Sequence, residues 1–169
     1  MSRTFIAGDA LRGLIAGTAA VYALDKLDQY MYDHQGAVAR RRTVAARPGG
    51  LDPAHVIANR AAEAAGTTLS PRQPHPAGIA IHYGLGGMMG ALYSVLRARV
   101  GVTSTGAGIP YGLVMFLAQD EGLNTVLGTG GRPKDYPWQD HARGAVAHGF
   151  FGFVTELLLR VLGGYRPRG

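Results

Sequence analysis

The fold class of this chain is decided by residues 135–160, DYPWQDHARGAVAHGFFGFVTELLLR. A Pro-Trp turn opens this stretch, and a long apolar, glycine-rich segment with helical character follows it. A segment of about 20 predominantly apolar residues is typical of a helix that crosses a membrane. His148 and Glu156 nevertheless lie within it. Because ionisable side chains that face lipid are costly, both groups are expected to find partners on other helices.

The composition is compatible with one domain covering residues 1–169. Only 17% of the residues are charged, 26 are glycine and none is cysteine, so disulfides and thiolate metal sites are excluded. The formal net charge is +6. Such an excess of basic residues suits either nucleic acid or anionic lipid headgroups.

Four apolar segments are predicted to form helices, at residues 8–32, 76–96, 105–127 and 138–162. The second and third segments are charge-free over most of their length, so they lack the polar face that each helix of a soluble bundle needs. None of the four has the alternating pattern of a strand. The sequence therefore predicts an all-α integral membrane bundle of four transmembrane helices.

A long polar connector, residues 33–75, separates the first two segments. Within it, Asp52 suits a helix N-cap, Pro53 the first helical position and Gly66 the helix stop. The resulting short helix either lies on the membrane surface or packs on the end of the bundle. The basic run Arg40–Arg42 has no aromatic platform beside it, which favours anionic lipid over nucleic acid as its partner.

Glycines recur at four-residue spacing in the apolar segments, a pattern that lets helix backbones approach closely. Those expected to serve helix packing are Gly13, Gly17, Gly86, Gly90, Gly108, Gly112, Gly144 and Gly152. Trp138, at the start of the last segment, is expected to anchor that helix at the membrane interface.

Several stretches carry a family resemblance: GLIAG (13–17), IHYGLGGMMGALY (81–93), GAGIPYG (106–112) and DYPW (135–138). In their order and spacing the chain resembles the YagU-like family of small bacterial inner-membrane proteins. The resemblance implies a multi-pass protein of the bacterial inner, or cytoplasmic, membrane. It also implies a link to acid resistance, without an established chemistry.

The ionisable residues of the apolar segments are expected to face inward as one polar seam, consisting of His82, Asp120, Glu121, His148 and Glu156. Three interpretations remain open for this seam: interhelical hydrogen bonding, proton handling, and a metal site of histidines and carboxylates. No His-x3-His or Glu-x2-His spacing supports the third, so no metal is predicted. The other histidines, His34, His55, His75 and His141, are expected to be solvated or at the membrane edge.

No phosphate-binding loop, nucleophile elbow or catalytic-triad spacing is present, so neither an enzyme nor a cofactor is predicted. Two functions remain open. The first is a proton- or pH-responsive inner-membrane protein linked to acid stress. The alternative is a non-catalytic structural or accessory subunit, which would use its glycine faces to form a homo-oligomer or to join a larger membrane complex.

Overall fold

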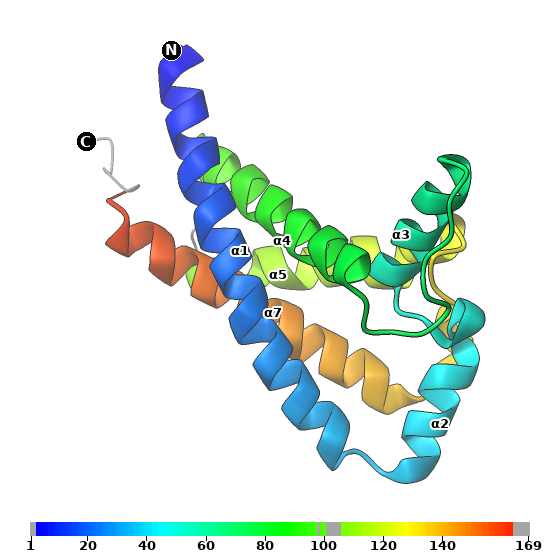
Figure 1. Cartoon of the computed structure of the whole chain (residues 1–169). Coiled ribbons are helices and arrows are strands. Elements are labelled where there is room, and N and C mark those ends of the chain that lie inside the picture. Colours follow the sequence, from blue (N-terminus) through cyan, green and yellow to red (C-terminus); the bar gives the residue numbers. More distant parts are fainter. Residues whose placement is uncertain (1–2, 98, 101–105, 164–169) are drawn as a thin grey trace.

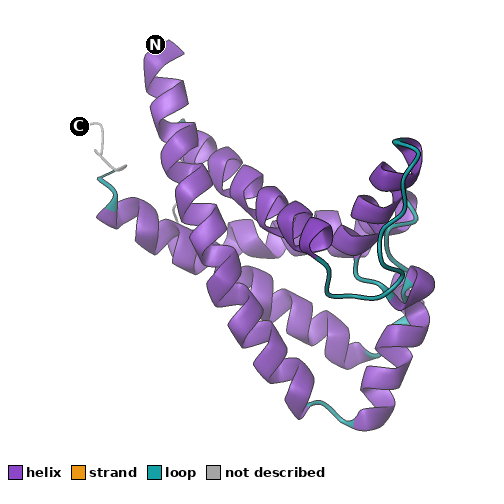
Figure 2. Ribbon diagram, in the orientation of Figure 1, coloured by secondary structure: helices purple, strands orange, loops and turns teal. Residues whose placement is uncertain are grey.

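The computed structural model describes residues 3–97, 99–100 and 106–163, and every regular element among them is helical (Figure 2). The predicted all-α class is therefore confirmed. The long helices are α1 (Arg3–His34), α4 (Pro76–Arg97) and α7 (Trp138–Val161). The shorter elements are α2 (Ala37–Ala46), η1 (Pro48–Gly50), α3 (Pro53–Ala64), α5 (Ile109–Met115), η3 (Phe116–Leu123), α6 (Asn124–Val126) and η4 (Pro133–Asp135).

Helix α1 is the central helix of the fold, because it packs along both α4 and α7 (Figure 1). Helix α5 packs on α7, and α3 packs on α4. Helices α2 and α3 gather at the end of the bundle away from the start of α1 (Figure 1). Two small apolar clusters lie along α1, one around Ala16, Tyr93 and Leu159 and the other around Ala20, Val21 and Phe151.

The third predicted helix, residues 105–127, is wrong as one continuous α-helix. Its first residue lies outside the described part of the chain, and the rest divides into α5, the π-helical turn η3 and the short α6. Helix α5 starts after Gly108, whose φ of 81° lies in the left-handed region that glycine tolerates, with Pro110 in its first turn. A π-helix makes i→i+5 hydrogen bonds and widens the helix locally, often at a functional site.

The connector contains two α-helices, not the single one predicted. Helix α3 begins as expected, since the Asp52 carboxylate accepts a hydrogen bond from the His55 backbone N–H at 3.0 Å. Helix α2, which carries the arginine run, was not anticipated. Downstream, the Nδ1 atom of His75 accepts the Gly78 backbone N–H at 3.1 Å and so caps the start of α4.

Glycines form both of the main helix crossings. In the first, α1 meets α4 where the backbones of Gly13 and Gly17 touch those of Gly86 and Gly90. A Cβ atom built on Gly17 would lie 2.8 Å from the Gly90 Cα atom. In the second, α5 meets α7, and a Cβ on Gly108 would overlap the Gly152 backbone. These are backbone-to-backbone contacts that any larger residue would obstruct.

Further along α7, Gly144 lies against the Phe116 ring, and Gly112 of α5 lies against the His148 backbone. The eight glycines singled out in the sequence are thus all in contact with another helix of the same chain.

Two of the described helices, α4 and α7, are long and apolar enough to cross a membrane by length and composition. Helix α1 is longer, but Asp25, Lys26 and Asp28 lie close together within it. The third segment is broken into short elements, as described above. The described part of the chain therefore contains two helices of transmembrane character, compared with the four spans predicted from the sequence.

Candidate functional site

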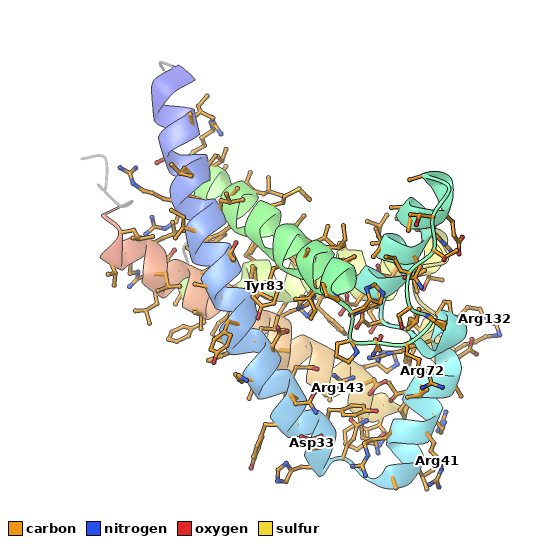
Figure 3. The ribbon with its side chains drawn as sticks, viewed as in Figure 1. Asp33, Arg41, Arg72, Tyr83, Arg132 and Arg143 are labelled. Carbon is orange, nitrogen blue, oxygen red and sulfur yellow. The ribbon has the colours of Figure 1, made fainter. Side chains whose placement is uncertain are left out.

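A cavity of about 970 Å³ lies among α1, α3, α4, η3 and α7. Tyr83 of α4 and Arg143 of α7 belong to its wall, and Figure 3 shows both in the interior, whereas Arg41 and Arg132 lie toward the periphery. Of the residues predicted to form the polar seam, four line this cavity: His82, Asp120, Glu121 and His148.

The cavity wall is acidic although the chain as a whole is basic. Its six carboxylates belong to Asp25, Asp28, Asp52, Asp120, Glu121 and Asp140, against which stand Lys26, Arg47 and Arg143. With its four histidines neutral, the wall therefore carries three negative charges, in a chain whose formal charge is +6. Such a wall attracts cations, protons included.

His148 lies between two acceptors. Its Nδ1 atom is 3.0 Å from the carbonyl oxygen of Gly144, so this nitrogen must carry a hydrogen and donate. Its Nε2 atom faces a carboxylate oxygen of Asp120 at 3.8 Å. A neutral imidazole with its hydrogen on Nδ1 would turn a lone pair toward that carboxylate. An imidazole with hydrogens on both nitrogens would instead turn an N–H toward that carboxylate.

His141, two helical turns earlier on α7, has the same environment. Its Nδ1 atom lies 2.6 Å from Glu121, and its Nε2 atom lies 3.1 Å from the Pro133 carbonyl oxygen. Because both nitrogens face acceptors, hydrogen bonds at both would require one hydrogen more than a neutral imidazole beside a carboxylate carries. His141 was expected to be solvated or at the membrane edge, and its side chain is 34% exposed and paired across to η3.

A third pair joins the first two long helices. His82 of α4 lies with its Nε2 atom 2.8 Å from the Asp25 carboxylate of α1. The sequence singled out His82 but gave it no partner on α1. The polar neighbour that Asp25 needed inside an apolar helix is therefore a histidine of the next long helix.

Arg143 links the cavity wall from α7 to α1. Its guanidinium donates to Asp28 at 2.6 Å and to Asp140 at 3.1 Å, so one cation is shared by two carboxylates. Sequence reasoning did not select Arg143. The available signal was its position three residues after Asp140, a spacing that brings charges together on one helix face.

Glu156 does not belong to the cavity, and its placement in the same seam as His148 is wrong. Its carboxylate is buried and accepts hydrogen bonds from Tyr93 at 2.8 Å and Arg160 at 2.7 Å, and it forms an ion pair with Arg97 at 2.6 Å. Gly152 lies one turn before Glu156 and one turn after His148, at the point where α5 crosses. The crossing separates the buried Glu156 cluster from the cavity.

His55 and His75 are buried, contrary to the expectation that they are solvated. The Nδ1 atom of His55 lies 2.8 Å from Asp52, and its Nε2 atom accepts the His75 backbone N–H at 3.1 Å. His55 thus has one acceptor and one donor, which a neutral imidazole satisfies. This pair of histidines ties the start of α3 to the start of α4.

Two further predicted residues lie at the surface. Trp138 is 72% exposed at the start of α7. Within the arginine run, Arg41 and Arg42 are exposed, whereas Arg40 donates to the backbone carbonyls of Asp33 and Gln35 at the end of α1. Arg40 is therefore occupied in joining α2 to α1, which leaves the two following arginines for a partner.

In the η4 turn, Asp135 accepts two hydrogen bonds from the Arg132 guanidinium, at 2.9 and 3.3 Å. This hydrogen-bonded cation lowers the pKa of the Asp135 carboxyl below its ordinary range. The pair is exposed and stands apart from the histidine–carboxylate pairs of the cavity.

Among the described residues, no three His, Asp or Glu side chains are arranged to hold a metal ion. Comparison of the chain with protein-family models, with curated proteins and with solved structures finds no match.

Proposed function

We propose that this chain is a multi-pass bacterial inner-membrane protein that responds to protons through its acidic cavity, and that this response serves survival in acid. The observation that carries the proposal is the placement of His141 and His148. Each imidazole has a backbone carbonyl oxygen at one nitrogen and a carboxylate at the other, so a proton added to the ring would face a negative partner.

The membrane part of the proposal is supported by where the apolar side chains lie. Helices α4 and α7 have 22% and 39% of their most apolar windows buried, whereas the core helix of a soluble protein would be mostly buried. Large apolar side chains are exposed on α1, α4, α5 and α7, including Leu14, Met88, Val114 and Leu157. Exposed apolar side chains on every one of these helices suit lipid contact. In the proposed topology, α1 and the α5–η3–α6 segment supply the other two spans.

Protonation changes the charge of the cavity wall. His148 faces Asp120 directly, and Glu121 of η3, Asp28 of α1 and Arg143 of α7 lie in the surrounding field. Adding protons to His141 and His148 removes two of the three net negative charges of the wall. Histidine is the side chain whose ordinary titration range makes such a change possible between about pH 5 and 8.

The accessory-subunit alternative loses its main support. It required the glycine faces to be available for another protein, but Gly13, Gly17, Gly86 and Gly90 already meet one another within the chain. The same holds for Gly108 and Gly152. A protein partner would need some other surface.

The membrane assignment is tested by fractionation. A multi-pass protein remains in the membrane pellet after an alkaline carbonate wash and is extracted only by detergent. Release of the protein by carbonate would refute the membrane proposal.

The proton assignment is tested with His148→Gln, whose side chain can still donate to the Gly144 carbonyl but cannot titrate. We expect cells with this variant to lose acid survival while the protein keeps its abundance and its melting temperature in detergent. His34→Gln is the matched control, because His34 is exposed at the end of α1 and bonds only to the Tyr30 carbonyl. Equal survival of the His148→Gln cells and the parent would refute proton handling.

A further inference from the structure

The sequence contains a repeated stretch that the function proposed above does not use. Residues 13–25 are GLIAGTAAVYALD and residues 108–120 are GIPYGLVMFLAQD. Both begin with G-x3-G, both have alanine at the eleventh position and both end in aspartate at the thirteenth. The two stretches lie on α1 and on the α5–η3 segment.

Each copy meets the following long helix in the same way. Gly13 and Gly17 touch α4 at Gly90 and Gly86, and Gly108 and Gly112 touch α7 at Gly152 and at the His148 backbone. In both crossings the first glycine of the repeat contacts the partner helix at a later residue than the second glycine does. The two helices of each hairpin are therefore antiparallel. The two hairpins therefore share an antiparallel crossing made by glycines.

Each copy also ends at an equivalent ion pair. The aspartate twelve residues after the first glycine is Asp25 in one copy and Asp120 in the other, and each faces a histidine of its partner helix, His82 and His148. Both pairs line the same cavity.

The two hairpins differ in the register of these pairs. His148 precedes Gly152 by four residues, whereas His82 precedes the corresponding Gly90 by eight. Asp120 lies on the π-helical turn η3, whereas Asp25 lies on the α-helix α1.

We infer that the chain is a duplicated helical hairpin, and that His82–Asp25 is a third proton-binding pair, the counterpart of His148–Asp120 across one cavity. This inference rests on the function proposed above. The carboxylates around His82 are those of Asp25 and Asp28 of α1 and Asp52 before α3, and Lys26 of α1 lines the same cavity. A proton on His82 also removes the last of the three net negative charges of the wall, so the wall becomes neutral when His82, His141 and His148 each carry an added proton.

The test follows the imidazole resonances of His82 and His148 by NMR in the full chain in detergent, from about pH 4 to 8. We expect both histidines to titrate in the parent. Asp25→Asn should lower the titration midpoint of His82 by about one pH unit, because the neighbouring carboxylate favours the protonated imidazole. The midpoint of His148 should stay in place, because a carboxylate acts mainly on a partner within about 4–6 Å. Asp120→Asn should give the converse.

Asp33→Asn is the control, because Asp33 is exposed and does not line the cavity, and it should shift the midpoint of neither histidine. If His148 titrates and His82 does not, or if Asp25→Asn leaves the midpoint of His82 unchanged, the His82–Asp25 site is refuted while the proposed function stands. If neither histidine titrates and acid survival does not depend on His148, the proposed function fails and this inference fails with it. If a variant is destabilised, a parent in which His82 does not titrate still refutes the His82–Asp25 site.

Discussion

The α1–α4 crossing gives the sharpest test of the fold, through two alanine substitutions on one helix. Gly90 and Gly84 both lie within α4, six residues apart. A Cβ on Gly90 would overlap the Gly13 carbonyl oxygen and lie 2.5 Å from the Gly17 Cα atom, whereas a Cβ on Gly84 would meet nothing within 4 Å. To restore an ordinary contact of about 3.5 Å, the two backbones must separate by about 1 Å at Gly90.

Overpacking of this kind costs about 1–3 kcal/mol. In the open position, replacing glycine by alanine stabilises a helix by about 0.5–1 kcal/mol. We therefore expect the free energy of unfolding of the Gly90→Ala variant to be about 1.5–4 kcal/mol lower than that of the Gly84→Ala variant. Thermal unfolding in detergent, with both variants purified in parallel, measures the difference. If the two variants melt together, α1 and α4 do not meet through these glycines.

Three further predictions concern other parts of the chain. Glu156→Gln should lower the free energy of unfolding by about 3–5 kcal/mol, because it breaks the buried ion pair with Arg97. A decrease of less than about 1 kcal/mol would show that the pair is solvated. Arg132→Ala should raise the titration midpoint of the Asp135 carboxyl, which carbon NMR measures. Because the pKa of Asp135 is lowered in the folded chain, the pair stabilises the fold above the ordinary titration range of aspartate, and this stabilisation disappears as the pH falls through the lowered pKa. An unchanged midpoint would contradict the pairing of Arg132 with Asp135. Arg60→Met should speed amide hydrogen exchange at the end of α6, where Arg60 donates to two backbone carbonyls at 2.6 and 2.8 Å. Exchange as slow as in the parent would mean that these two hydrogen bonds do not stabilise the end of α6.

Much of the helical architecture could be predicted locally. Long apolar runs with glycine at four-residue spacing predict close-packed helices, and the observed limits of α4 and α7 agree with the predicted segments to within a residue. The N-cap at Asp52 was likewise visible, because capping depends on the side chain and the next few residues alone.

The third segment could not be predicted in the same way. Its apolar pattern is that of an ordinary helix, and nothing in the residues 116–123 signals i→i+5 hydrogen bonding. That turn changes which side chains of η3 face α7, and so decides the partners of Asp120 and Glu121.

The sequence by itself determined that this chain is helical, that glycines mediate its helix contacts and that ionisable residues inside apolar helices must be paired. Those properties depend on composition and on periodicity along a single segment. Only the tertiary structure decided which charges share a space. It placed His148 with Asp120 and His82 with Asp25 around one cavity, and it put Glu156 with Arg97 beyond a glycine crossing. The physical reason is that a pairing depends on where two helices cross, and a crossing point is set by contacts between residues far apart in the chain.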